Sequence, residues 1–234
     1  MKLLPPCVAE FIGTFTLIFI GIGAIANMNP PLLTATHLPI NLLAIALAHG
    51  LAIAVMVTAT LHISGGQLNP AVSIALMVTG KITPREGIAF IISQLAGAVV
   101  AAAACRGLFG VDIVRGGTPA LAATTSVAAG IAIEAILTFF LVFVIFGTGV
   151  DSRGRGATTG LAIGFTVCLD ILFGGPLTGA AMNPARTFGP ALVANYWPNH
   201  FVYWIGPIAG GILAGVVYNT FFLRTFTPEK AVER

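Results

Sequence analysis

The sequence predicts an all-α integral membrane protein with six transmembrane helices and two re-entrant half-helices. Three observations lead to this fold class. Of the 234 residues, 57% are hydrophobic and only 8% are charged, whereas an ordinary soluble domain is about 25% charged. Six apolar runs are long enough to cross a bilayer, which takes about 20 residues. Two further apolar runs are too short to cross, and they resemble each other in sequence.

The six spans are predicted from apolar runs without Lys or Arg, at 8–28, 40–62, 87–105, 126–150, 157–175 and 200–223. The first run is too long for the core of a signal peptide, so we interpret it as a span. The two short runs lie near 69–79 and 183–194. At ten to twelve residues, we expect each to form a half-helix that enters the membrane and turns back.

Six spans place both termini on one side of the membrane, and the basic residues indicate which side. Eight basic residues lie on the side of the termini: Lys2, Lys81, Arg85, Arg153, Arg155, Arg224, Lys230 and Arg234. Three lie on the other side: Arg106, Arg115 and Arg186. The positive-inside rule therefore predicts cytoplasmic termini. We expect a multi-pass protein of the cell (plasma) membrane.

The chain contains an internal repeat, with a first unit at 1–120 and a second at 121–234. Residues 9–23 align with 133–147, and the identical pairs are Glu10/Glu134, Ile12/Ile136, Thr14/Thr138, Phe15/Phe139, Leu17/Leu141, Phe19/Phe143 and Gly23/Gly147. Each unit holds three spans and one half-helix. Because three is odd, the second unit must enter from the opposite face, which makes the repeat inverted. The two half-helices can then meet near the midplane.

Each half-helix is predicted to start at an Asn-Pro-Ala motif, at 69–71 and 183–185. Asn69 and Asn183 are good N-caps, and Pro70 and Pro184 suit the first helical position. With each Asn oxygen used in capping, its NH2 group is expected to point away as a donor. Two positive helix ends and two amide donors would thus converge on one spot.

With these paired motifs, the chain resembles the aquaporin, or major intrinsic protein, family over nearly its whole length. The residues that carry the resemblance are Ala9–Thr14, His62–Gly66, the motif Asn69-Pro70-Ala71, and Asn183-Pro184-Ala185 with the following Arg186–Pro190. The family implies a homotetramer in the lipid bilayer in which each protomer has its own pore. It also implies a passive channel that excludes protons and ions.

The family's selectivity filter, carried over by spacing from the two Asn residues, falls on His49, Ile171, Ala180 and Arg186. This set differs from strict water channels and from glycerol facilitators, and it resembles some plant tonoplast intrinsic proteins. The resemblance implies passage of water and of small neutral solutes such as ammonia, urea or hydrogen peroxide. Gln67 stands where many water channels have a His.

Glu10, Glu134 and Asp170 are carboxyl groups expected within the membrane, where ionisable residues are costly. Glu10 and Glu134 occupy equivalent repeat positions. We expect each to accept hydrogen bonds from the loop before a half-helix, although a relay role stays open. Asp170 has no equivalent. It is expected either to reach the outer surface or to act beside Ile171 and Arg186.

Two alternatives remain within transport: a glycerol or polyol facilitator, and a secondary transporter built from inverted repeats. No set of nucleophile, base and metal ligands stands out in the sequence, so we expect no enzymatic activity, no cofactor and no metal site. The small net charge of +3 gives no indication of nucleic-acid binding.

Overall fold

The computed structural model describes residues 3–28 and 41–223, and all of the regular structure in these residues is helical. The elements are α1 (Leu4–Asn27), α2 (Leu42–Thr60), α3 (Pro70–Val78), α4 (Pro84–Phe109), α5 (Val111–Gly116), α6 (Val127–Ile145), η1 (Phe146–Val150), α7 (Thr159–Thr178), α8 (Pro184–Ala194), α9 (Val202–Tyr218) and η2 (Asn219–Leu223). The π-helical turns η1 and η2 prolong α6 and α9.

The fold-class prediction is confirmed. In the described part of the chain, six helices are long and apolar enough to cross a membrane, namely α1, α2, α4, α6 with η1, α7, and α9 with η2. Their outward side chains are large and apolar, as at Leu51, Ile92 and Phe140, each of which is about half exposed or more. Such a surface suits lipid rather than water. Of the basic residues used for orientation, Lys2, Arg224, Lys230 and Arg234 lie outside the described residues.

Local sequence explains where several helices begin. The side chain of Thr83 accepts from the backbone N–H of Glu86, whose carboxyl group accepts from the N–H of Thr83, and this capping box starts α4. Asn41 and Ser126 cap α2 and α6 in the ordinary way. The short helix α5 was not predicted, because six residues in a loop give no periodic pattern.

Each half of the chain contains the same close packing between two helices. A Cβ atom on Gly97 of α4 would lie 2.4 Å from the carbonyl oxygen of Phe11 in α1. A Cβ atom on Gly210 of α9 would likewise lie 1.9 Å from the carbonyl oxygen of Ala135 in α6. Phe11 and Ala135 are equivalent in the aligned repeat. Each half therefore packs its first and third spans backbone to backbone, which only glycine allows.

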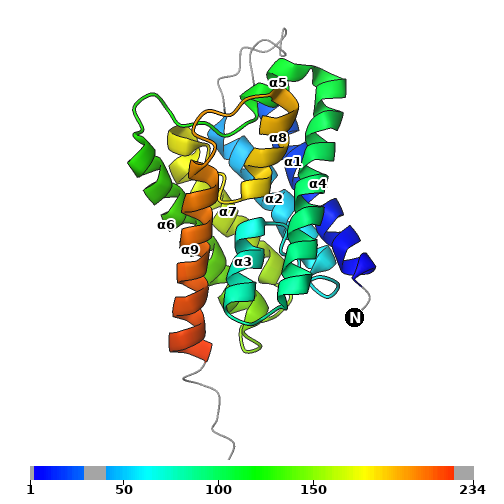
Figure 1. Cartoon of the computed structure of the whole chain (residues 1–234), viewed down its shortest axis with the longest axis vertical. Coiled ribbons are helices and arrows are strands. Elements are labelled where there is room, and N and C mark those ends of the chain that lie inside the picture. Colours follow the sequence, from blue (N-terminus) through cyan, green and yellow to red (C-terminus); the bar gives the residue numbers. More distant parts are fainter. Residues whose placement is uncertain (1–2, 29–40, 224–234) are drawn as a thin grey trace, which may run out of the picture.

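The two half-helices enter the bundle from opposite ends. Figure 1 shows α3 in the lower half and α8 in the upper half, with their N-terminal ends facing each other near the centre. The start of α1 and the end of α9 lie at the same, lower end of the bundle. Helices α3 and α8 match the two short apolar runs to within a residue or two.

Candidate pore and selectivity filter

The two Asn-Pro-Ala motifs meet in the middle of the molecule. The side-chain oxygen of Asn69 accepts from the N–H of Ala71 at 2.9 Å, and that of Asn183 accepts from the N–H of Ala185 at 3.0 Å. Both Asn residues therefore cap their half-helices as predicted. A proline follows each cap. Because proline has no N–H group, the first helical position leaves no donor without a partner.

Each Asn NH2 group points away from its own cap as a donor, and one of its two hydrogens already has an acceptor. Nδ2 of Asn69 donates to the carbonyl oxygen of Met182 at 2.8 Å, and Nδ2 of Asn183 donates to that of Leu68 at 2.9 Å. These reciprocal bonds tie the two half-helices together across the repeat. An amide nitrogen carries two hydrogens, so one hydrogen on each Asn remains for another acceptor. Both side chains line the same central cavity.

Glu10 and Glu134 hold the extended segments that precede the half-helices. Both are completely buried. The carboxyl oxygens of Glu10 accept from the N–H groups of Gln67 at 2.9 Å and Leu68 at 2.6 Å. Those of Glu134 accept from the N–H groups of Ala181 at 3.0 Å and Met182 at 2.7 Å. This geometry supports the structural role over a relay.

The backbone of these segments adopts a conformation that carries a cost. Leu68 and Met182, directly before the two Asn residues, have φ angles of +53° and +51°. Non-glycine residues rarely adopt this left-handed conformation, which costs about 1–2 kcal/mol. The carboxyl groups of Glu10 and Glu134 bind the N–H groups of these same residues, and so stabilise the turn that aims each Asn at the centre.

His49, Ile171, Ala180 and Arg186 come together as the filter prediction requires. All four line the central cavity. The terminal nitrogen Nη2 of Arg186 lies 3.3 Å from Nε2 of His49, whose Nδ1 lies 2.8 Å from the carbonyl oxygen of Ile45. Because a guanidinium can only donate, Nε2 of His49 accepts and Nδ1 donates. This pairing requires the neutral imidazole with its hydrogen on Nδ1.

Packing restricts the His49 ring. A Cβ atom on Gly21 of α1 would lie 2.4 Å from Nε2 of His49, so the ring rests directly against the α1 backbone. Arg186 is 7% exposed, and its second terminal nitrogen lies 3.5 Å from the carbonyl oxygen of Gly117. The guanidinium is thus held between α2 and the loop after α5.

The cavity narrows between two wide mouths. The central section has a volume of about 30 Å³, which holds two or three waters at about 10–15 Å³ each. The mouth at the end of the bundle away from the start of α1, named the outer mouth, also contains His49 and Arg186 and has about 550 Å³. The mouth at the end where α1 starts and α9 ends, named the inner mouth, lies next to Gln67 and α3 and has about 330 Å³. The central wall is mostly apolar.

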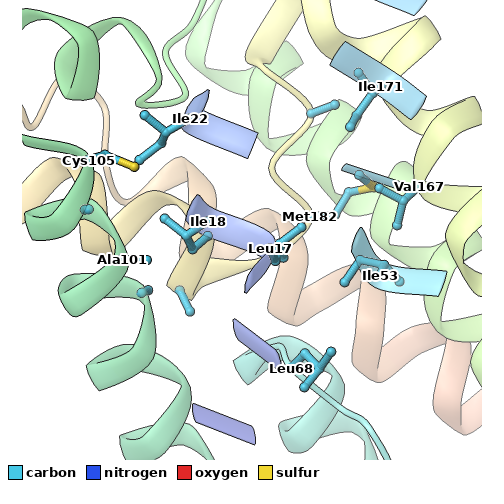
Figure 2. Packing of buried hydrophobic residues seen from close by; sticks show 14 of the residues in the cluster. Leu17, Ile18, Ile22, Ile53, Leu68, Ala101, Cys105, Val167, Ile171 and Met182 are labelled. Carbon is cyan, nitrogen blue, oxygen red and sulfur yellow. The ribbon is translucent and has the colours of Figure 1, made fainter. Parts of the chain in front are cut away.

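Figure 2 shows that some side chains of α1 face the buried core and that another faces the central passage. Ile18 and Ile22 turn toward Ala101 and Cys105 of α4, where they belong to the buried core. Leu17 turns the other way and lies with Met182 and Ile53 around the passage. One helix therefore seals the bundle with one face and lines the passage with the other.

Comparison with known proteins agrees with this arrangement of two capped half-helices around a narrow passage. Residues 1–218 match the model of the family described as "Major intrinsic protein". The chain belongs to the major intrinsic protein family. It is similar to "Aquaporin TIP4-4" of Zea mays, with 43% identity over 92% of this chain and 85% of that protein.

Two further likenesses extend across this family. "Aquaporin-4" of Mus musculus is 40% identical over 92% of this chain and 66% of its own length. Among solved structures, the aquaglyceroporin from Plasmodium falciparum matches with a TM-score of 0.82 and 25% identity, over 96% of this chain and 98% of that one. This family member is therefore an integral, multi-pass membrane protein with the aquaporin fold.

Gln67, Ser73 and Gln94 form a polar network next to the inner mouth. Of these three residues, only Gln67 was singled out from the sequence. The hydroxyl of Ser73 donates to Oε1 of Gln67 at 2.6 Å, and Nε2 of Gln94 lies 3.0 Å from that hydroxyl oxygen and 2.8 Å from Oε2 of Glu10. The network links α4 to α3 and orients Gln67 at the passage. An amide within an apolar span was the available signal for Gln94.

Of the two expectations for Asp170, the structure contradicts the first, that it reaches the outer surface. It is 3% exposed, so it does not reach the outer surface. It lies eight residues before the end of α7 at Thr178. Spacing of four residues places it on the same helix face as Gly174 and Thr178, away from the cavity linings. Its Oδ2 atom has no hydrogen-bond partner within residues 3–28 and 41–223.

Proposed function

We propose that this protein is a passive channel for water and small neutral solutes such as ammonia, urea and hydrogen peroxide. One observation carries the proposal. A passage of about 30 Å³ joins two wide mouths and has the Asn69 and Asn183 amides at its side. A space of that size suits molecules of a few atoms, and its apolar wall retains them weakly.

Exclusion of protons follows from the central donors. A water molecule beside Asn69 and Asn183 presents its oxygen to the remaining amide hydrogens, so its own hydrogens point away from the centre. A chain of waters with one orientation is then interrupted at this point. The N-terminal ends of α3 and α8 add positive potential, and this opposes hydronium and other cations.

The filter is proposed to consist of His49, Ile171, Ala180 and Arg186. Because the guanidinium of Arg186 is hydrogen-bonded to His49, it is held against one side of the passage and still offers donors to passing solutes. Ala180 and Ile171 complete the wall with one small and one apolar side chain. An opening with this lining accommodates ammonia or urea better than a ring with two bulky aromatic groups.

Stopped-flow light scattering on proteoliposomes tests the proposal. We expect osmotic water flow well above that of empty vesicles, linear in the gradient, with uptake of ammonia and urea and little of glycerol. Rapid glycerol uptake would favour the polyol facilitator. A flux that saturates with solute, or flow equal to the lipid background, would refute a channel.

Assembly, placement and repeat organisation complete the proposal. The protein forms a homotetramer with cytoplasmic termini, and its chain divides into repeats at 1–120 and 121–234. The sequence alone favoured the cell membrane, whereas the TIP-type relatives favour the tonoplast. Protease protection of a tag at either terminus tests the orientation, and membrane fractionation tests the location.

A further inference from the structure

The inner mouth of the passage carries a charge that conduction of neutral solutes does not require. Its cavity of about 330 Å³ is lined by Lys81 from the segment after α3 and by Arg155 from the loop before α7. The same cavity includes Gln67, Val72 and Ile163, which also line the central passage. The two cations therefore stand where solutes enter or leave.

Within residues 3–28 and 41–223, neither cation has an acidic partner. The side chains of Lys81 and Arg155 are exposed, and no described carboxyl group lies within ion-pair distance of either. The carboxyl group of Asp151, four residues before Arg155, instead accepts from the side chains of Arg153 and Tyr218. No Asp or Glu is among the described residues that line this mouth.

The positive-inside rule explains basic residues in inner loops, but it does not require that two of them face one cavity. Arg85 satisfies the rule at the same end of the bundle without lining the mouth. Lys81 also follows the C-terminal end of α3, where a cation is favourable. Arg155 does not follow the C-terminal end of a half-helix, since it lies in the segment between η1 and α7. The helix dipole therefore does not explain its position.

We propose that Lys81 and Arg155 form a binding site for a phosphate-type oxyanion at the inner mouth, and that its occupation obstructs the passage. A guanidinium fork and an ammonium group together match the oxygens of a phosphate group. The cavity has room for such an ion. Free phosphate or pyrophosphate and the headgroup of an anionic lipid share this chemistry. The obstruction rests on the proposed channel function, but the binding does not.

The first test measures binding alone. Inorganic pyrophosphate is titrated calorimetrically into the full-length protein in detergent. We expect binding to weaken at least about tenfold in the double variant Lys81→Gln/Arg155→Gln, because two charge-assisted contacts are lost. The matched control is Arg85→Gln, an exposed cation at the same end, which should bind like wild type. Absent binding, or equal binding by the double variant, would overturn the proposal.

The second test measures obstruction. Water permeability of proteoliposomes is recorded with pyrophosphate on both sides, against sodium chloride of equal ionic strength to control for screening. We expect at least about a twofold decrease in wild type and Arg85→Gln, and no decrease in the double variant. Bound pyrophosphate that leaves the permeability unchanged would overturn the proposal. Vesicles without any channel activity would instead count against the proposed function, while the calorimetry would still decide the site.

A third arm separates the two sources of the anion. Wild type and the double variant are compared in pure phosphatidylcholine and in phosphatidylcholine with phosphatidylglycerol, without added phosphate. Lower permeability of wild type alone in the anionic vesicles identifies the lipid headgroup as the occupant. Equal permeability in both lipids, with block by pyrophosphate, identifies the free anion.

Discussion

Replacing Glu10 by Ala should cost stability rather than alter selectivity, because the side chain serves buried donors and does not line the passage. The Glu10 carboxyl group is the acceptor for two buried N–H groups, those of Gln67 and Leu68, and for the side chains of Ser64 and Gln94. Each buried donor left without a partner costs about 1–3 kcal/mol. The two backbone groups alone therefore predict a loss of about 2–6 kcal/mol in the free energy of unfolding.

The assay combines thermal unfolding in detergent with the yield of monodisperse protein and the permeability per folded molecule. At about 2–4 °C per kcal/mol for a chain of this size, Glu10→Ala should unfold roughly 4–24 °C below wild type. Glu10→Gln, which keeps one acceptor oxygen, should lose about half as much. Glu134→Ala should match Glu10→Ala, because it exposes the equivalent two N–H groups.

Glu86→Ala is the matched control, since Glu86 sits in the exposed capping box of α4 and its loss costs about 1 kcal/mol. The reasoning is refuted if Glu10→Ala folds with wild-type yield and stability and yet conducts a different set of solutes. That outcome would assign Glu10 to the conduction path.

Three further predictions address the filter, the outer end and helix packing. His49→Phe should narrow the solute range toward water by filling the space beside Arg186; unchanged urea uptake would remove His49 from the filter. At the outer end, the indole N–H of Trp204 donates to Nε2 of His200, and burial lowers the pKa of His200 below its ordinary value of 6.5. The folded state therefore binds fewer protons than the unfolded state as the pH falls through 6.5, so stability should decrease there. Thermal unfolding of His200→Gln should show less of this decrease, and an equal decrease would place the titration elsewhere. Gly97→Ala should destabilise by about 1–3 kcal/mol because its Cβ meets the α1 backbone, whereas Gly107→Ala, with open space around it, should be neutral or slightly stabilising; equal unfolding temperatures would contradict the packing argument.

The sequence predicted the six spans and the two half-helices because hydropathy and capping are local properties. Asn69 and Asn183 cap their helices through donors two residues away, so neighbouring residues were enough to identify them. Span ends differ by a few residues because the helices begin at caps such as Thr83 rather than where the apolar run starts. Burial of Asp170 could not be predicted, since it depends on what packs against α7.

The tertiary structure alone decided the contacts that join distant parts of the chain. The bond between Glu10 and Gln67 spans 57 residues and that between Arg186 and His49 spans 137. The acceptors of the Asn69 and Asn183 amides, the neutral form of His49 and the placement of Lys81 and Arg155 at one mouth all depend on such distances. Sequence alone determined which residues carry donors, acceptors and charges, and folding in three dimensions determined which of them meet. The physical reason is that hydrogen bonds and close packing act over a few ångströms, whichever distance along the chain separates the groups.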